Sequence, residues 1–212
     1  NYKKILDEIY TDFRKSKSLS DLPFLPANIF KNHEMLSVQK NKIIKTISSS
    51  GTSGKPVSKI YLDKENSVNQ TKALNKIVSY YIGKKRLPML VFDKKNILKD
   101  RNLFSARGAA IRGLSLFSKE ICYVFKDSEC KIIDTKSLKY FFEKHKDNQV
   151  LIFGFTYILW TKIFEEEGFN ILQSFRESIV VHGGGWKKLE RQSVTKDIFD
   201  SRISDFFNTS ES

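Results

Sequence analysis

Cysteine and histidine are scarce in this sequence, which has two cysteines and three histidines among its 212 residues. Cys122 lies in the apolar run 121–125, where a buried core thiol is the expected environment. The two cysteines and the dispersed histidines do not form a set with the spacing of metal ligands. So few cysteines also argue against a disulfide framework, and we expect the reducing environment of the cytoplasm.

Long apolar runs are absent, because no stretch approaches the length that a membrane-spanning helix requires. The first residues, 1–8, lack the apolar core and the cleavage site of a secretory signal peptide, and they do not begin with methionine. We therefore expect no membrane span and no secretory signal, and we expect the amino terminus to be trimmed.

Acidic residues are few relative to basic ones, and the formal net charge is +13. A basic domain with abundant aromatic residues can bind nucleic acid. No recognition helix, RNA-binding aromatic pair or zinc finger accompanies the charge, and the lysines are spread along the chain. A solvated basic surface is the favoured interpretation, so nucleic acid is not expected as a partner. A non-catalytic nucleic-acid-binding module stays open as an alternative.

Short apolar runs alternate with amphipathic stretches of helical length. The pattern predicts strands at 43–47, 57–62, 88–92, 121–125, 131–133, 150–153 and 178–181. It predicts helices at 26–35, 64–81, 106–116, 135–146, 155–167 and 197–203, with Gly154 as the turn into the helix at 155–167. This alternation predicts an α/β fold, with a layered sheet that carries helices on both faces. No internal repeat or clear linker is present, so residues 1–212 are expected to form a single domain.

The longest predicted helix has clear end signals. Asp63 is expected to cap its start, and Gly83 is expected to end it. One face of this helix is expected to be buried, namely the face that carries Val68, Leu74, Ile77, Val78 and Tyr81.

A loop rich in hydroxyl groups and glycine, 48–56, separates the first two predicted strands. Glycine lets the backbone approach a ligand closely, and consecutive N–H groups can form an anion-binding concavity. The serine and threonine hydroxyls add hydrogen-bond donors, and Lys55 or Lys59 adds positive charge. The composition predicts a polyphosphate-binding loop. A flexible Ser/Gly linker is the alternative, which the flanking strands and the Lys-Pro ending disfavour.

The spacing excludes a Walker A loop. That loop has four residues between its glycines, followed by Lys and Ser/Thr at the start of a helix. Here two residues separate Gly51 from Gly54, and Pro56 follows Lys55. Proline has no N–H group to offer to a phosphate or to a helix. The loop is therefore expected to hold phosphate in another way.

A second glycine-rich segment, His182–Lys188, follows the last predicted strand. In an open α/β sheet, ligands bind at the carboxyl ends of the strands. Three consecutive glycines would let a flat ligand lie against bare backbone, and Trp186 would form a wall beside it. A tight turn with a packed tryptophan is the alternative.

The first loop resembles the phosphate-binding signature of the adenylate-forming enzymes, which include acyl-CoA synthetases, luciferase and adenylation domains. Their pattern is Ser/Thr-Ser-Gly-Ser/Thr-Thr/Ser-Gly-x-Pro-Lys, and 49–56 fits it throughout. Val57 stands where the family usually has lysine, and Lys59 is the expected replacement. The resemblance implies that the phosphates of ATP are held by Ser49, Ser50, Gly51, Thr52, Ser53, Gly54, Lys55 and Lys59.

The form His-Gly-Gly-Gly-Trp-Lys is similar to that of the acyl-protein synthetases, the fatty-acid-activating ligases of bacterial bioluminescence. The segment Leu22–Pro26, followed by Ile29–Lys31, is similar to their amino-terminal region. The resemblance covers most of the chain, from about residue 20 to residue 212. It implies that adenine is bordered by Gly183, Gly184, Gly185 and Trp186. Phe155, Thr156 and Trp160 are candidates for the acyl side, although core packing is the favoured interpretation for them.

A third family signature, usually Tyr-Gly-Met-Thr-Glu, is matched weakly at the end of the chain. Phe207 would replace the tyrosine that stacks on adenine, and Asn208 would replace the glycine. Ser210 would replace the threonine that touches the α-phosphate, and Glu211 would replace the glutamate that holds Mg²⁺. The resemblance thus implies Ser210 and Glu211 as catalytic residues and Glu211 as the metal ligand. A frayed polar terminus is the alternative.

The implied activity is ATP-dependent activation of a carboxylic acid, expected to be a fatty acid, to acyl-AMP with transfer to a protein thiol. ATP and Mg²⁺ are the implied cofactors, and an acyl reductase or acyl carrier is the implied protein partner. An acyl- or aryl-CoA ligase of the phenylacetate type stays open as an alternative. The family's ribose-binding acid, its carboxyl-terminal lysine and its acceptor cysteine cannot be placed here. We therefore expect the amino-terminal part of such an enzyme, truncated and inactive alone.

Overall fold

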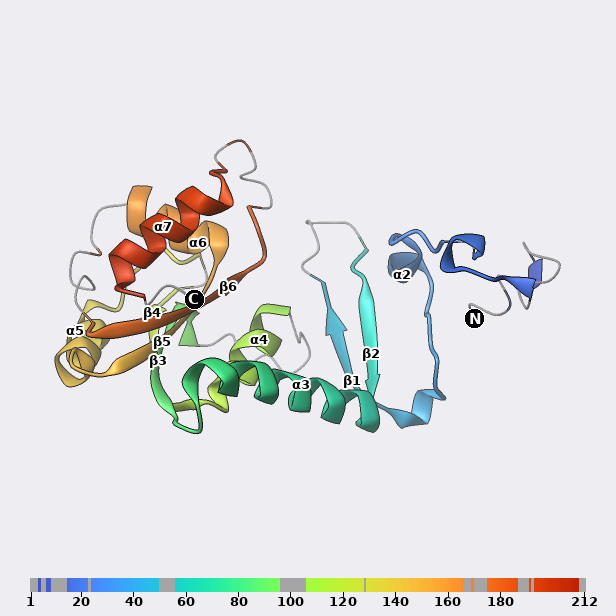
Figure 1. Ribbon diagram of the computed structural model, residues 1–212, viewed down its shortest axis with the longest axis horizontal. Coiled ribbons are helices and arrows are strands. Elements are labelled where there is room, and N and C mark those ends of the chain that lie inside the picture. Colours follow the sequence, from blue (N-terminus) through green and yellow to red (C-terminus); the bar gives the residue numbers. More distant parts are fainter. Residues whose placement is uncertain are drawn as a thin grey trace. The chain divides into compact units, whose positions relative to one another are not determined.

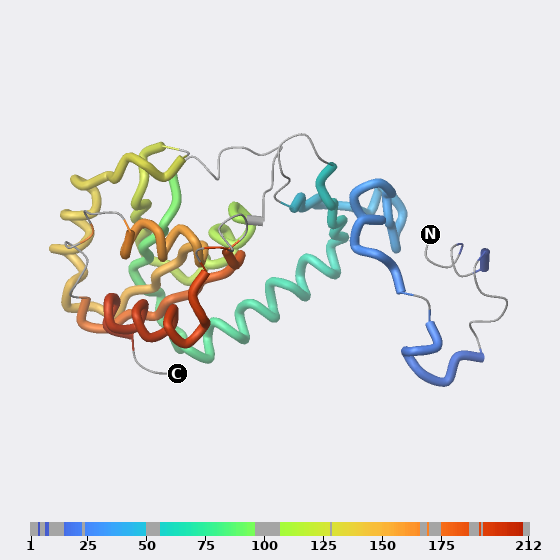
Figure 2. The backbone as a smooth tube through the Cα atoms, turned by 90° about the horizontal axis from the view of Figure 1, so that it is seen from above, coloured from blue at the N-terminus to red at the C-terminus, as the bar shows by residue number. Residues whose placement is uncertain are grey.

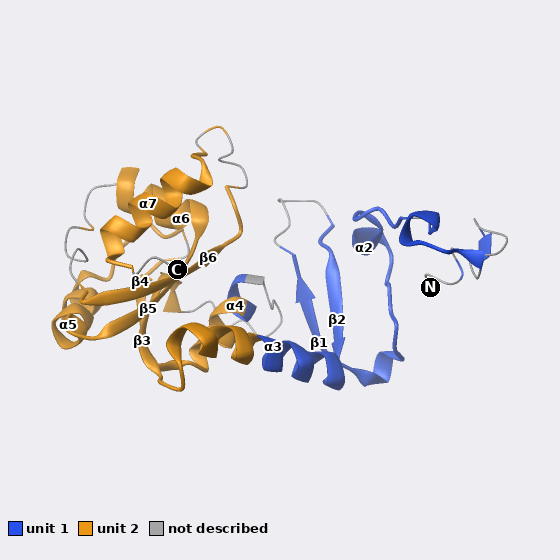
Figure 3. Cartoon of the chain, in the orientation of Figure 1, with its two compact units in different colours: residues 1–73, 101–109 blue, residues 74–100, 110–212 orange. Residues whose placement is uncertain are grey.

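The computed structural model describes residues 4, 7–8, 15–22, 24–49, 56–95, 106–127, 129–165, 169, 175–186, 191 and 193–209 (Figure 1). The chain divides into two compact units, one formed by 1–73 and 101–109 and the other by 74–100 and 110–212 (Figure 3). Each unit has its own sheet, and the expectation of a single domain stays a prediction. Among the described helices, none combines the length and the apolar character needed to cross a membrane.

The first unit contains a two-stranded antiparallel sheet. β1 (Ile43–Ser48) pairs with β2 (Lys59–Asp63), and Ser48 lies opposite Lys59. These strands confirm the prediction of a strand on each side of the Ser/Gly loop. Short helical turns precede them, namely η2 (Leu19–Asp21), α2 (Ile29–Asn32) and η3 (Lys40–Lys42). The helix predicted at 26–35 is thus much shorter, because none of its residues is buried and no packing supports a longer one.

α3 (Lys64–Ile82) is a regular helix of 19 residues (Figure 2). The Asp63 carboxylate accepts a hydrogen bond from the N–H group of Asn66 at 2.8 Å. Gly83 follows the helix with a φ of +66°, in the left-handed region that favours glycine. Both predicted helix ends are therefore confirmed.

The predicted buried face of α3 is partly wrong. Val78 is buried, but Ile77 and Tyr81 are 60% and 56% exposed. Ile82, one residue beyond the predicted end, is buried instead. A single helix of mixed hydrophobicity offers more than one apolar stripe, and its neighbours decide which stripe is covered.

The second unit is built around a parallel sheet with the strand order β4–β3–β5–β6. Its strands are β3 (Leu87–Lys94), β4 (Ser118–Phe125), β5 (Gln149–Phe155) and β6 (Glu177–Gly183). The seven residues 87–93 of β3 are all buried, as expected for a central strand covered on both faces. The predicted strands are confirmed at these four places, and the observed strands extend beyond the predicted limits.

Helices cover both faces of this sheet. On one face, α4 (Ala106–Ser115) and the end of α3 pack with Met89 and Val91. On the other face, α5 (Thr135–His145), α6 (Thr156–Trp160) and α7 (Lys196–Phe207) pack with Leu90 and Phe92. Alternate residues of β3 therefore enter two separate cores. The predicted α/β class, with helices on both faces of a layered sheet, is confirmed.

Two local predictions are wrong. The segment 131–133 is not a strand, and only an isolated bridge joins Ile133 to Phe125. The Asp127 carboxylate accepts hydrogen bonds from the N–H groups of Lys131 and Ile132, which bends this segment into a turn. Gly154 is not a turn residue, because it lies inside β5. The helix that follows begins at Thr156 and continues as a π-helical turn, η5 (Thr161–Glu165).

Candidate functional site

The carboxyl ends of the parallel strands meet at one edge of the sheet, and the topology singles out one place along that edge. In the strand order, β4 lies on one side of β3, whereas β6 lies on the opposite side of β5. The connections that follow β3 and β5 therefore run in opposite directions along the sheet. In an open α/β sheet, ligands bind in the crevice where the strand order reverses. That place lies between the ends of β3 and β5, and β6 ends beside it, where Gly183 pairs with Phe155. The predicted glycine-tryptophan segment, 182–186, therefore begins at this edge.

Thr156, the first residue of α6, joins the ends of β5 and β6. Its side chain is buried, and its hydroxyl donates a hydrogen bond to the carbonyl of Gly183 at 3.2 Å. The same oxygen lies 3.1 Å from Nδ1 of His182. A hydroxyl has one hydrogen, so Nδ1 supplies the hydrogen of this second bond. This arrangement favours the neutral tautomer of His182 with its proton on Nδ1 and a lone pair on Nε2.

The three glycines of the segment differ in whether the fold itself requires glycine at that position. A Cβ atom at Gly184 would lie 2.2 Å from the Phe155 ring, and the φ of +86° there also favours glycine. Gly185 needs glycine only for its φ of +57°. Gly183 has neither requirement, because a Cβ atom there would meet none of the described residues within 4 Å. Backbone geometry and packing thus leave Gly183 unexplained, as expected where a ligand lies close to the backbone.

Trp186 belongs partly to the core. Its ring lies 5.8 Å from that of Trp160 and 6.3 Å from that of Phe199, both in edge-on contacts. Phe199 is 3% exposed and also contacts the His182 ring at 4.7 Å. Trp160 and Thr156 are likewise buried, as the core interpretation predicts. The packed tryptophan proposed as the alternative is therefore present, and only the exposed part of the Trp186 ring can border a ligand.

The charge state of His182 depends on α7. Burial lowers the pKa of His182 below its usual 6.5, while the negative charge of Asp200 acts to raise this pKa and Lys196 acts to lower it. Lys196 forms an ion pair with Oδ2 of Asp200, and its positive charge offsets the effect of Asp200 on the pKa of His182. The imidazole is therefore neutral at pH 7, and its Nε2 lies 4.0 Å from Oδ1 of Asp200. Two hydrogen-bond acceptors face each other there, beyond hydrogen-bonding distance.

Asp93 is a buried acid at the end of β3, close to the place where the strand order reverses. Its side chain is 2% exposed and accepts a hydrogen bond from the N–H group of Lys94 at 2.7 Å. Burial raises the pKa of Tyr123 on the neighbouring strand, and the charge of Asp93 raises it further. The sheet therefore has a buried carboxyl group at its carboxyl edge.

The Ser/Gly loop lies in the first unit, and the structure describes its base. The N–H group of Ser49 donates to the carbonyl of Ser58 at 2.9 Å, and the N–H group of Ser58 donates to Oγ of Ser49 at 3.0 Å. Lys59 is exposed at the start of β2. The predicted phosphate ligands Ser50, Gly51, Thr52, Ser53, Gly54 and Lys55 lie outside the described residues.

Phe207, the predicted adenine-stacking residue, is the last residue of α7. It is 1% exposed and packs at 5.9 Å from the ring of Phe92, so its ring has no open face in this structure. Asn208 ends the helix with a φ of +51°, and its amide donates to the carbonyl of Arg176 at 2.7 Å. Ser210 and Glu211 lie outside the described residues, so their roles stay predictions. Within the described part of the chain, no cluster of three or more His, Cys, Asp or Glu side chains could hold a metal ion.

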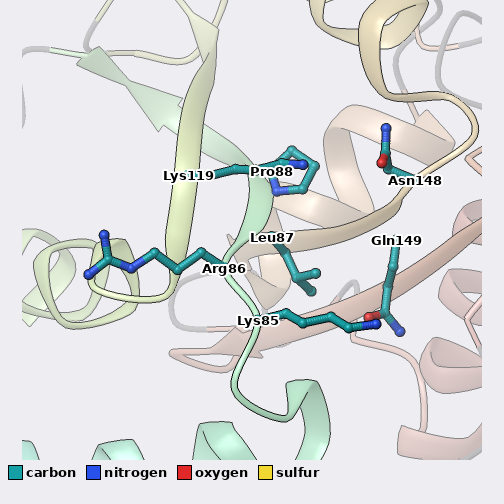
Figure 4. Close-up of a pocket in the computed structure, with 7 residues that line it drawn as sticks. All are labelled: Lys85, Arg86, Leu87, Pro88, Lys119, Asn148 and Gln149. Atoms are coloured by element: carbon teal, nitrogen blue, oxygen red, sulfur yellow. The ribbon is translucent and has the colours of Figure 1, made fainter.

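A polar hollow of about 400 Å³ opens at the amino edge of the sheet, opposite the glycine-tryptophan segment (Figure 4). It is lined by Lys85, Arg86, Leu87, Pro88, Lys119, Asn148 and Gln149. Figure 4 shows Lys85 pointing toward Gln149 and Arg86 pointing away from both. Ligands of open α/β sheets bind at the carboxyl ends of the strands, so we assign the candidate site to that edge.

Sequence analysis missed the partners of His182. The helix predicted at 197–203 contains Phe199 and Asp200, but helical periodicity does not indicate which end of the sheet the helix covers. Thr156 was expected on the acyl side or in the core, and its bond to His182 has no local sequence signal. Sequence analysis also missed Asp93, although this residue has a local signal. It is a single acid at the end of the apolar run 87–92, which is where a strand reaches the ligand-binding edge of a sheet.

The chain matches the model of a known protein family. The family model described as acyl-protein synthetase, LuxE, matches residues 2–212, which is nearly the whole chain. No curated protein matches the chain. The family match includes both glycine-rich segments, and it confirms the resemblance that these segments indicate.

Proposed function

Because the chain belongs to the acyl-protein synthetase family, we propose that it activates a carboxylic acid with ATP and passes the acyl group to a protein thiol. The family match over residues 2–212 is the observation that carries this proposal. A carboxylate oxygen attacks the α-phosphorus of ATP, the bond to the pyrophosphate oxygen breaks, and acyl-AMP forms. A protein thiolate then attacks the acyl carbon and AMP leaves, while the thiol proton passes to solvent. A fatty acid is the proposed substrate, and an acyl reductase or acyl carrier is the proposed partner.

The Ser/Gly loop is the proposed binding site for the β- and γ-phosphates. The antiparallel pairing of β1 and β2 and the two hydrogen bonds between Ser49 and Ser58 close the base of the loop. A loop fixed at its base loses less entropy when its N–H and hydroxyl donors converge on an anion. Mg²⁺ would neutralise phosphate charge, and Glu211 is the residue proposed to hold it.

The glycine-tryptophan segment is the proposed border of adenine. No described residue occupies the side of Gly183 where a Cβ atom would project, and the Gly183 carbonyl accepts a hydrogen bond from Thr156. Positioning and charge stabilisation dominate phosphoryl-centre chemistry, so a fixed backbone at this place supports the proposed reaction.

The acyl-accepting thiol is not one of the two cysteines of this chain. Cys122 and Cys130 are 8% and 4% exposed. Burial raises the pKa of Cys122 to about 12, and the charges of Asp134 and Glu120 raise it as well. The nucleophile in such a transfer is the thiolate, which Cys122 does not form at neutral pH. We therefore propose that the acceptor thiol comes from outside residues 1–212.

The proposal is tested by measuring release of pyrophosphate from MgATP by the native protein, with and without a fatty acid. Release should require the acid. Thr52→Ala removes one donor to a charged oxygen, which costs on the order of 1.5–3 kcal/mol of transition-state stabilisation, or about 10- to 150-fold in rate. Gly54→Val adds bulk where the backbone meets the phosphates and should reduce release at least as strongly.

The matched control is Ser20→Ala, which removes an exposed hydroxyl of η2 that bonds only to Ser18 among the described residues. Its rate of pyrophosphate release should stay within twofold of the original, as is usual for an exposed surface substitution. Release that does not depend on a carboxylic acid would overturn the proposed reaction. Unchanged release in both loop variants would remove the phosphate role from this loop.

A further inference from the structure

His182 and Asp200 present two hydrogen-bond acceptors to the same point. Nε2 of His182 and Oδ1 of Asp200 are 4.0 Å apart, and the two side chains are 35% and 39% exposed. No hydrogen lies between them when His182 is neutral, because Thr156 holds the imidazole proton on Nδ1. A donor placed between two facing acceptors can bond to both at once. The pair is open to solvent and therefore also to a ligand.

Both acceptors are held in place by other contacts. The His182 ring is fixed by Thr156 at one edge and by Phe199, whose ring centre lies 4.7 Å away, at one face. Asp200 is fixed through its other oxygen, which pairs with Lys196 on the same helix. A preorganised pair of acceptors discriminates between ligands better than mobile groups do, since little order has to be created on binding.

The chemistry of the pair specifies its ligand. A single nitrogen that carries two hydrogens can lie about 2.9 Å from both acceptors, because the acceptors are only 4.0 Å apart. The exocyclic amino group of adenine is such a nitrogen. A purine with a carbonyl at the same position would place a third acceptor against the first two.

We propose that Nε2 of His182 and Oδ1 of Asp200 together recognise the exocyclic amino group of adenine, which makes His182 a specificity-determining residue for ATP. This inference rests on the proposed function, in which the adjoining residues 183–186 border adenine. It gives the exposed Nε2 of His182 a role beyond the packing of the ring against Phe199 and the bond between Nδ1 and Thr156.

The test compares three nucleotides in carboxylate-dependent release of pyrophosphate by the native protein. These are ATP, the triphosphate of purine riboside, which lacks the amino group, and inosine triphosphate, which carries a carbonyl there. The kcat/KM for the purine riboside nucleotide should be about tenfold lower than that for ATP, as expected for one lost hydrogen-bonded group. Inosine triphosphate should be poorer still, because its carbonyl oxygen would face two other acceptors, which repel it.

Two variants separate recognition from structure. In His182→Asn the amide nitrogen can still donate to Thr156, but no acceptor remains near the position of Nε2. In His182→Gln the amide oxygen can take the place of Nε2. The asparagine variant should reduce the preference for ATP over purine riboside triphosphate from about tenfold to about threefold, because only Oδ1 of Asp200 remains as an acceptor. The glutamine variant should retain most of the preference. Equal thermal unfolding midpoints would show that both variants are folded alike.

The outcomes distinguish this inference from the proposed function. If no nucleotide supports carboxylate-dependent release, the proposed function fails and the inference fails with it. If release occurs but ATP and purine riboside triphosphate are used equally well, the function stands and the inference is overturned. The inference is also overturned if the asparagine variant keeps the full preference for ATP.

Discussion

Gly183 and Gly184 are adjacent glycines with different environments. A Cβ atom at Gly184 would lie 2.2 Å from the ring of Phe155, and the residue has a φ of +86°. In the described part of the chain, a Cβ atom at Gly183 would meet no atom within 4 Å, and its φ lies outside the left-handed region. The first glycine is therefore free to serve a ligand, whereas the second serves the fold.

This difference predicts opposite behaviour for two alanine variants. Gly184→Ala should lower the free energy of unfolding by about 1–3 kcal/mol, because it combines backbone strain with a clash. Gly183→Ala should change the free energy of unfolding by less than about 0.5 kcal/mol, as an uncrowded position does. It should nevertheless weaken ATP binding, because the methyl group occupies the space beside the backbone. Denaturant unfolding and calorimetry with MgATP measure the two effects. Tight ATP binding by Gly183→Ala would contradict the proposed adenine border.

Helix α5 shows how a single side chain sets an element boundary. Oδ1 of Asp134 accepts a hydrogen bond from the N–H group of Ser137 at 3.3 Å, and Oδ2 accepts one from the Ser137 hydroxyl at 2.8 Å. Burial acts to raise the pKa of Asp134, but the Ser137 hydrogen bonds and the charge of Lys126 outweigh it and lower the pKa below its usual 3.8. The ionised cap therefore stabilises the folded state.

Asp134→Ala should lower the free energy of unfolding by about 1 kcal/mol, the usual loss for a helix cap. Because the folded-state pKa is depressed, the stabilisation by Asp134 is present above pH 3.8 and is lost as the pH falls through the folded-state pKa. The difference between the original protein and the alanine variant should therefore shrink in acid. Denaturant unfolding at pH 7 and at low pH measures it. Asp134→Asn is the matched control at pH 7, because asparagine caps a helix about as well as aspartate. A loss of equal size in both variants at pH 7 would contradict the capping role.

At the scale of the whole molecule, the parallel sheet of the second unit carries most of the core. Strand β3 is the centre of this arrangement, because it pairs with both β4 and β5 and enters a core on each face. Leu151 of β5 is fully buried beside it, opposite Met89. Both tryptophans of the chain, Trp160 and Trp186, lie in the same unit, so their fluorescence follows its unfolding.

Leu151→Ala should lower the free energy of unfolding measured by tryptophan fluorescence by about 2–5 kcal/mol, because it leaves a cavity in a packed core. Ile44→Ala is the control, since Ile44 lies on β1 of the first unit and is 61% exposed. That variant should change the same transition by less than about 0.5 kcal/mol. A loss below about 1 kcal/mol for Leu151→Ala would contradict the central position of this strand.

Much of the second unit could be predicted from the sequence by itself. The run 87–92 is apolar throughout, which is typical of a strand that is buried on both faces of its sheet. The boundaries marked by Asp63, Gly83 and Asp134 were also predictable, because each depends on hydrogen bonds or dihedral angles within a few residues. The local sequence likewise predicted the strands on either side of the Ser/Gly loop. It also carried the family resemblance of both glycine-rich segments.

The tertiary structure decided which of these features come together. Ile77 and Tyr81 fit a buried helical face by spacing, yet they are exposed, because burial depends on what packs against the helix. Phe207 was assigned from a family signature, and only the packing shows that its ring lies against Phe92, while its role toward adenine stays a prediction. The acceptor pair of His182 and Asp200 joins a strand end to a helix that follows later in the chain. Local patterns fix dihedral angles and hydrogen bonds between near neighbours, whereas contacts between distant residues exist only once the layers have packed.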